Sequence, residues 1–280
     1  DENTVRFTEK DTSVNICIQG EDIKAGDVVM RKGEIIHPQH IGLLATVGCA
    51  SPLVGRQPVV GVIATGSELV EPGEKPGTSQ IRNSNSYQLC AQVTRAVCVA
   101  EYNGIAVDTE EATDKAIKDA MSKSDVILLS GGVSMGDFDF VPEILRDNGF
   151  DLLFEKIAVK PGMPTVFGCS EKCFCFGLPG NPVSTFVVFE LLAKPFLLKL
   201  MGHDFEPFVV PIRLDKTIVR KKIKRDSWVP VRRCETGGVE ALEYHGPAHL
   251  NCLSNSIGMI CVPRGMSEVK EGAIVDVRQI

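Results

Sequence analysis

Three glycine-rich turns hold the residues of this chain whose types and spacing best suit chemistry. They span residues 65–69, 130–139 and 177–184, and each begins where a short apolar run ends. Short apolar runs closed by turn residues are typical of buried strands in a parallel sheet. Ligands of such sheets bind beyond the carboxyl ends of the strands, where glycine lets backbone N–H groups approach a phosphate. Three such turns therefore predict a nucleotide-like or phosphorylated ligand. The candidate binding residues in the turns are Thr65, Gly66, Ser130, Gly131, Gly132, Ser134, Gly136, Pro179, Gly180, Asn181 and Pro182.

Two carboxylates near these turns are candidates for holding a metal ion. Asp139 stands where a helix through residues 140–145 should start, so it is either a helix N-cap or a ligand beside an anion site. Glu68 follows the first apolar run, and its alternative role is that of a first-turn or surface glutamate. If both face one crevice, they form an oxygen site of the kind that Mg²⁺ prefers, suited to phosphoanhydride chemistry.

Two lysines add positive charge. Lys156 and Lys160 flank residues 157–159 in a predicted strand that ends at Pro161-Gly162-Met163-Pro164. A spacing of four residues puts both side chains on one face of a strand. There they would bind phosphate or another oxyanion, although strand-edge lysines are as often simply solvated.

The pattern between residues 57 and 205 indicates the element order that must position these groups. Apolar runs alternate with stretches of helical periodicity such as 112–121, for which Asp108 and Glu111 offer a capping box. Asn181 and Pro182 suit the N-cap and first position of a long helix. The alternation predicts a three-layer α/β/α domain with a mostly parallel sheet. Its predicted strands are 59–64, 98–107, 126–129, 153–159 and 173–177.

Two smaller regions flank this domain. Residues 1–56 contain short β-like pieces and a possible helix at 38–46, which predicts a β-rich partial domain. After residue 206, short apolar runs separated by Gly, Pro and Asn predict a carboxyl-terminal β-barrel or sandwich of roughly 75 residues. The predicted domains are therefore 1–56, 57–205 and 206–280.

Composition excludes several classes of protein. A net charge of −6 argues against broad nucleic-acid binding, and no apolar stretch nears the roughly 20 residues that span a bilayer. The amino end shows no basic and apolar leader, and five of the ten cysteines sit in apolar runs where a thiol behaves as a small hydrophobe. These features favour a protein of the reducing cytoplasm without nucleic-acid or membrane partners.

Several motifs together resemble the molybdopterin molybdenumtransferase family, the MoeA type that is shared with the E domain of gephyrin. The matching segments agree in order and spacing along the α/β region. Residues 20–23 and the carboxyl-terminal β region are also similar, so the resemblance covers nearly all 280 residues. The main matching segments are 65–69, 80–85, 130–139, 160–164 and 178–184.

The resemblance implies a reaction. Such proteins take adenylylated molybdopterin and molybdate, hydrolyse the adenylate with Mg²⁺, and release molybdenum cofactor and AMP. It further implies a homodimer of four-part architecture, which could meet the molybdopterin adenylyltransferase and molybdoenzymes as partners. Asp22 matches an acidic family position in the β-rich part, and Pro161 and Gly162 belong to a cofactor-binding motif. The family's functional positions fall on Glu68, Asp108, Asp139, Lys156, Lys160, Pro179 and Pro182.

This sequence also departs from the family pattern. Ser67 and Met163 stand where the family usually has Asp and Lys, and residues 246–248 replace a Gly-Ser turn. An amino-terminal segment with a Ser-Ala-Met-Asp-Gly-Tyr-Ala type motif, which would complete the active site of a dimer, is absent from the sequence. Three hypotheses therefore stay open: a molybdenum-inserting enzyme, a non-catalytic molybdopterin-binding or carrier module, and a hydrolase of another nucleotide or pyrophosphate. The sequence does not distinguish molybdenum from tungsten.

Overall fold

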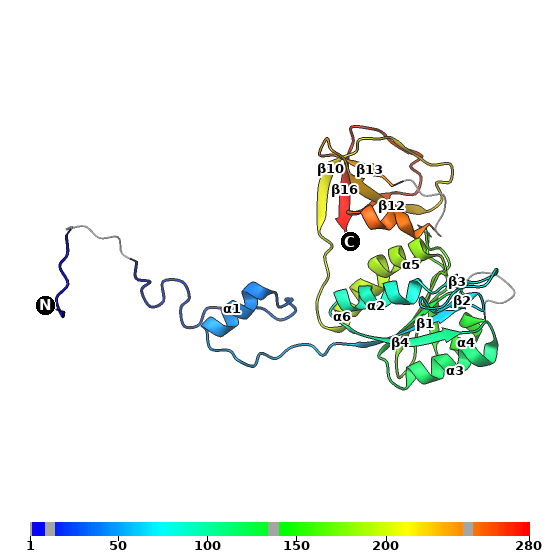
Figure 1. The fold of residues 1–280 in the computed structure, drawn as a ribbon, viewed down its shortest axis with the longest axis horizontal. Coiled ribbons are helices and arrows are strands. Elements are labelled where there is room, and N and C mark those ends of the chain that lie inside the picture. Colours follow the sequence, from blue (N-terminus) through cyan, green and yellow to red (C-terminus); the bar gives the residue numbers. More distant parts are fainter. Residues whose placement is uncertain (1, 9–14, 134–139, 243–248) are drawn as a thin grey trace. The chain divides into compact units, whose positions relative to one another are not determined.

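The computed structural model describes residues 2–8, 15–133, 140–242 and 249–280. The chain divides into two compact units, Asp1–Leu53 and Val54–Ile280 (Figure 1). In the described part of the chain, no helix combines the length and the apolar character needed to cross a membrane.

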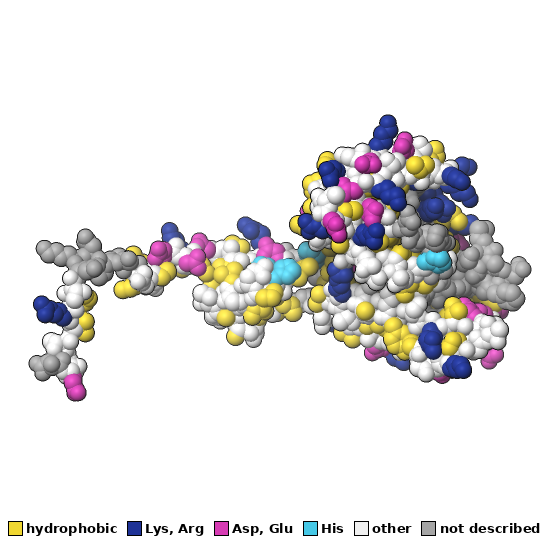
Figure 2. All heavy atoms as spheres, turned by 45° about the horizontal axis from the view of Figure 1, so that its top comes forward, with side chains coloured by type: hydrophobic (Ala, Val, Ile, Leu, Met, Phe, Trp, Pro, Cys, Tyr) yellow, Lys and Arg dark blue, Asp and Glu magenta, His cyan; other side chains and the backbone are white. Residues whose placement is uncertain are grey.

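The first unit contains one helix, α1 (Pro38–Thr46), at the residues where the sequence predicts it. The β-rich segment predicted for residues 1–56 is not seen in the described part of this unit, where no strand is assigned. An extended segment becomes a strand only when a neighbour satisfies its backbone groups, and this unit has too few buried apolar residues to hold such neighbours together. Ile16, Ile18 and Val28 are exposed, and Figure 2 shows hydrophobic side chains at the surface of this unit.

The second unit has a six-stranded sheet of order β4-β1-β5-β9-β8-β6. The first four strands are mutually parallel, and β8 is antiparallel to both of its neighbours. The mixed α/β fold is therefore confirmed, and the carboxyl ends of β1, β5 and β9 meet at one edge. The strands are β4 (Val99–Ala106), β1 (Val59–Thr65), β5 (Val126–Ser130), β9 (Phe174–Leu178), β8 (Val166–Cys169) and β6 (Asp151–Phe154).

Helices cover both faces of this sheet (Figure 1). Alternation along β1 explains this, because successive side chains of a strand point to opposite faces. Val60 and Val62 pack with α2 and the helices after β9, whereas Ile63 packs with α3 and α4. The helical elements are α2 (Asn85–Arg95), α3 (Glu110–Met121), α4 (Val141–Asp147), α5 (Pro182–Val188), the π-helix η1 (Phe189–Ala193) and α6 (Lys194–Leu200).

The carboxyl-terminal part of the second unit is built on a largely antiparallel sheet of order β10-β16-β14-β12-β13, with the short strand β7 (Val159–Lys160) alongside β12. The second unit as a whole also contains two small strand pairs and a 3-10 helix, η2 (Leu250–Asn255). The sheet strands are β10 (Val209–Arg213), β16 (Ile274–Gln279), β14 (Gly258–Val262), β12 (Asp226–Arg233) and β13 (Val239–Ala241). The pairs are β2 (Leu69–Val70) with β3 (Ile81–Arg82) and β11 (Ile218–Val219) with β15 (Glu268–Val269).

Local boundaries differ from the prediction in three regions. The single strand predicted at 153–159 is instead β6 and β7, which belong to different sheets; between them the N–H of Ile157 turns to donate to the carbonyl of Met163. Helix α3 is capped by Thr109 rather than Asp108, because the Thr109 hydroxyl accepts the N–H of Ala112 at 3.2 Å. Phe140 holds the N-cap position of α4.

Candidate functional site

A cavity of about 700 Å³ lies at the carboxyl ends of β1, β5 and β9. Parts of all three glycine-rich turns line it, together with residues 81–85, Asp108 and Pro164. Leu250 of η2 adds a wall from the carboxyl-terminal part of the same unit. The turns converge because parallel strands that are neighbours in a sheet end at the same edge.

Direct contact between the turns depends on the absence of side chains. The N–H of Gly131 donates to the carbonyl of Leu178 at 3.0 Å, which ties the second turn to the third. A Cβ on Gly131 would lie 2.6 Å from the carbonyl oxygen of Thr65, and the φ of Gly131 is +104°. A Cβ on Gly180 would lie 3.6 Å from the Cα of Gly131, an ordinary contact. The three backbones therefore pack closely only while position 131 is glycine.

Asn85, the first residue of α2, joins the second and third turns from a fourth segment. Its Nδ2 donates to the hydroxyl of Ser130 at 2.8 Å and to the carbonyl of Gly180 at 2.7 Å. A carbonyl only accepts hydrogen bonds, so the amide nitrogen must face Gly180 and the amide oxygen must face elsewhere.

Two oxygens of cavity-lining residues are buried without a hydrogen-bond partner among the described residues. They are Oδ1 of Asn85 and Oγ1 of Thr65. Buried polar atoms in native proteins are nearly always paired, so each of these two oxygens is missing a partner within the described part of the chain. A ligand with polar groups would supply it.

The candidate carboxylates have different surroundings. Oδ2 of Asp108 accepts the N–H of Ser67 at 2.9 Å, and the N–H of Asp108 donates to the Ser67 hydroxyl at 3.1 Å. Asp108 thus fastens the first turn to the loop after β4. Glu68 is exposed, and its carboxylate folds over Gly66, where a Cβ would lie 2.7 Å from Oε2. Both carboxylates line the cavity.

The predicted metal pair is not tested. Asp139, Ser134 and Gly136 lie outside the described residues, so the structure gives no position for the second carboxylate. Within the described ranges, no group of three or more His, Cys, Asp or Glu side chains gathers as a ready metal site.

The lysines are not brought together as predicted. Lys156 lies between β6 and β7 and Lys160 on β7, so they do not share a strand face, and both are exposed. Neither is among the described residues that line the cavity. The reason is that the chain turns between β6 and β7, whereas the prediction treated residues 153–159 as one continuous strand.

The segment after Lys160 contributes one cavity residue, Pro164, rather than the predicted Pro161 and Gly162. Those two are buried, and a Cβ on Gly162 would lie 2.3 Å from Cγ2 of Val188 in α5. Gly162 therefore serves the packing of this segment on a helix. Thr65, Gly66, Ser130, Gly131, Gly132, Pro179, Gly180, Asn181 and Pro182 all line the cavity.

Sequence reasoning missed the chemical role of residues 81–85. Asn83 is buried, and its Oδ1 accepts the N–H of Ser86 at 3.2 Å while its Nδ2 donates to the Tyr102 hydroxyl at 2.9 Å. Arg82 brings a cation to the cavity wall, with Nε donating to the carbonyl of Pro72 at 3.0 Å. The available signal was the polar run Asn83-Ser84-Asn85 at the start of an amphipathic helix.

Comparisons with known families agree with this geometry. A family model described as a probable molybdopterin binding domain matches residues 61–199. A second, described as the MoeA N-terminal region (domain I and II), matches residues 2–48.

Curated relatives and solved structures extend these matches. A molybdopterin molybdenumtransferase of Staphylococcus epidermidis is 37% identical over 281 residues, and one of Staphylococcus aureus is 35% identical over 280 residues. Each match covers 94% of this chain and 64% of the relative, so the chain spans less than two thirds of those proteins. A crystal structure of a MoeA molybdopterin biosynthesis protein from Pyrococcus horikosii has a TM-score of 0.82 at 29% identity, covering 93% of this chain and 64% of that one. A molybdenum cofactor biosynthesis protein from Pyrococcus furiosus has a TM-score of 0.73 at 26% identity, covering 93% and 82%.

Proposed function

Because the chain belongs to the MoeA-type molybdopterin molybdenumtransferase family, we propose that it acts in molybdenum cofactor biosynthesis and binds molybdopterin in the cavity of about 700 Å³. The observation that carries the proposal is the pair of orphaned oxygens, Asn85 Oδ1 and Thr65 Oγ1. A pterin carries N–H groups that the Asn85 oxygen would accept. A phosphate or carbonyl oxygen would accept the Thr65 hydroxyl.

The glycine turns would bind the phosphates of this ligand. Gly131 and Gly132 follow directly on the carboxyl end of β5 and line the cavity, so a phosphate bound there would meet their backbone. Pro182 opens α5, and the N-terminus of a helix favours an anion. Arg82 and Pro164 complete the walls beside this region.

We further propose the finer reaction, in which adenylylated molybdopterin and molybdate are substrates and AMP is released. The donors suit Mg²⁺, because the Glu68 carboxylate lines the cavity and hard cations prefer oxygen ligands. Glu68 and Asp139 would hold the ion, which would neutralise charge on the leaving phosphate. Lys156 and Lys160 would attract the anionic substrates from the surface. The same proposal includes a homodimer and a cytoplasmic location. It also includes the three domain bounds, the three-layer core and the carboxyl-terminal barrel.

A non-catalytic binding or carrier role is the second candidate, and three observations favour it. The Asp108 carboxylate is engaged by the first turn, Ser67 stands where the family usually has Asp, and the two lysines do not line the cavity. A carrier needs the ligand contacts alone, whereas turnover needs groups that stabilise charge as the anhydride breaks.

The replacement Thr65→Val tests the site. The Thr65 hydroxyl has no partner among the described residues, so its loss should leave the melting temperature unchanged or slightly raised. If the hydroxyl binds molybdopterin, the affinity should fall about tenfold, as expected for one hydrogen bond worth about 1.4 kcal/mol. Thr94→Val is the matched control, because the Thr94 hydroxyl donates to the carbonyl of Cys90 within α2, away from the cavity.

Fluorescence titration with molybdopterin measures the affinity, and a nucleotide assay measures AMP released from the adenylylated form with Mg²⁺ and molybdate. Wild-type affinity in Thr65→Val would reject the cavity as the site. Tight binding by the wild type without AMP would reject the enzyme in favour of the carrier.

A further inference from the structure

The helix that leaves the third turn is irregular for a reason visible in the sequence. α5 runs into the π-helix η1 before α6 begins, and Pro195 is the second residue of α6. A proline inside a regular helix clashes with the carbonyl four residues earlier and lacks an N–H. The wider π turn accommodates it.

This turn frees one carbonyl group. The N–H of Lys194 donates to the carbonyl of Phe189, five residues earlier, and so is not available to Glu190. The corresponding donor for Glu190 would be Pro195, which has none. The carbonyl of Glu190 is thus left for a donor from another element.

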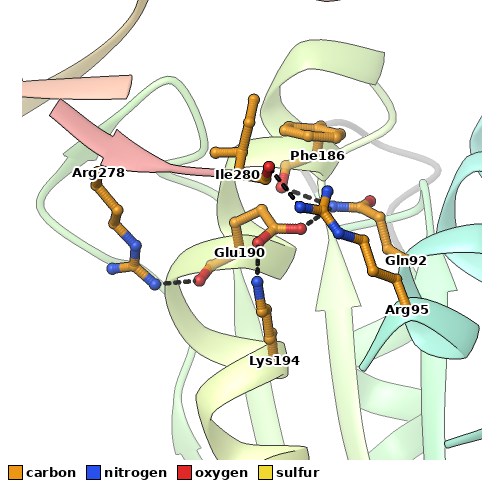
Figure 3. A network of polar contacts seen from close by, with 7 residues as sticks. All are labelled: Gln92, Arg95, Phe186, Glu190, Lys194, Arg278 and Ile280. Carbon is orange, nitrogen blue, oxygen red and sulfur yellow. Dashed lines mark hydrogen bonds and ion pairs between the residues drawn. The ribbon is translucent and has the colours of Figure 1, made fainter. Parts of the chain in front are cut away.

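Arg278 of β16 is that donor. Its Nη2 lies 2.5 Å from the carbonyl oxygen of Glu190 (Figure 3). The guanidinium also lies 5.7 Å from the ring centroid of Phe205 and 5.8 Å from that of Trp228. Burial lowers the pKa of Arg278, and the nearby Glu190 carboxylate acts in the opposite direction. The carboxyl-terminal strand therefore contacts the π turn through a half-buried cation.

The Glu190 side chain extends the contact to α2. It is 2% exposed, and its carboxylate lies 2.9 Å from Lys194 Nζ. Gln92 of α2 donates to its other oxygen at 2.9 Å and approaches the carbonyl of Phe186 at 3.4 Å (Figure 3). A buried carboxylate with these partners is compensated, and losing one partner would be costly.

A second contact joins the same strand end to the end of α2. Arg95, the last residue of α2, donates to the carbonyl oxygen of Ile280 at 2.5 Å. The helices α2 and α5 both begin at the cavity, with Asn85 and Pro182. The contact network of Gln92, Arg95, Glu190, Lys194, Arg278 and Ile280 thus lies toward the opposite ends of the two helices that shape the cavity.

We propose that Arg278 is a positioning residue for the cavity: by occupying the carbonyl freed at Glu190, it holds α2 and α5 in the arrangement that places Asn85 against Gly180. The inference rests on the proposed function for its binding readout. The carboxyl-terminal sheet thus contributes to ligand affinity through Arg278, although Arg278 itself does not touch the ligand.

The test combines Arg278→Met with Pro195→Ala. Methionine keeps an apolar stem but removes the donor, and we expect molybdopterin affinity to fall about tenfold. Alanine at 195 restores an N–H, so the Glu190 carbonyl regains a main-chain donor whether the turn stays π or becomes α. The double variant should return to within about threefold of wild-type affinity. Arg213→Met is the matched control, because Arg213 lies on β10 of the same sheet and pairs with Asp215.

Hydrogen exchange of residues 85–89 gives a readout that does not depend on molybdopterin. Arg278→Met should speed exchange there and Arg213→Met should not. Unchanged exchange and affinity in Arg278→Met would overturn the inference, as would weakened binding that Pro195→Ala does not restore. A wild-type protein that does not bind molybdopterin would reject the proposed function, while the exchange data would still decide the role of Arg278. If Arg278→Met does not fold, Arg95→Met removes the second contact and is judged by the same exchange criterion.

Discussion

A pair of glycine replacements tests how the three turns form one cavity. Gly131 and Gly180 both line it, and their surroundings differ. At Gly131 a Cβ would meet the carbonyl oxygen of Thr65 at 2.6 Å, at a φ of +104°. At Gly180 the nearest atom, the Cα of Gly131, would be 3.6 Å away. Gly131→Ala should therefore be severe and Gly180→Ala mild.

The size of the effect follows from two costs at Gly131. A side chain held at such a φ costs about 1–3 kcal/mol, and forcing a carbon against a neighbouring backbone costs about 1–3 kcal/mol more. The sum, about 4 kcal/mol, should lower the melting temperature by about 8–16 °C in a domain of this size. Gly180→Ala should stay within about 1 kcal/mol of the wild type.

Differential scanning calorimetry of both variants and the wild type under one buffer condition measures the difference. The same samples titrated with molybdopterin should show weakened binding for Gly131→Ala, because the first and second turns are pushed apart. A Gly131→Ala protein that melts within about 2 °C of Gly180→Ala would refute the close packing of these turns.

Three further predictions concern the framework around the site. Hydrogen bonding from Arg56 is the main cause that lowers the pKa of Asp125, so Asp125→Asn should lose about 1 kcal/mol of stability at pH 7. Because the folded pKa lies below the unfolded value of about 3.9, that difference should shrink as pH falls below 4 through the folded pKa, as urea titrations at several pH values would show. Burial raises the pKa of Cys98 to about 11, so iodoacetamide at pH 8 should label exposed Cys17 much faster than Cys98. Equal labelling rates of the two thiols, measured by mass spectrometry, would contradict the burial of Cys98. Gly162→Ala should lower the melting temperature by several degrees although Gly162 does not line the cavity, because the new Cβ would meet a valine of α5 at 2.3 Å; an unchanged melting curve would exclude that contact.

The sequence by itself determined the elements whose signals are local. Apolar runs closed by glycine predicted β1, β5 and β9, and helical periodicity predicted α3. Since strand order follows parallel-sheet rules, the meeting of the three turns at one edge was also predictable. These features depend on residues that are near neighbours in the chain, so the local sequence pattern is enough to predict them.

Only the tertiary structure decided the contacts between distant segments. Nothing near Asn85 reveals that its amide meets Ser130 and Gly180, and nothing near Glu190 reveals that Arg278 serves its carbonyl. Lys156 and Lys160 likewise lie apart because the chain turns after β6. The strand β7 then pairs with β12, which begins more than sixty residues later. Each outcome depends on which distant segments lie side by side once the chain has folded, and that is a property of the whole fold rather than of any window of sequence.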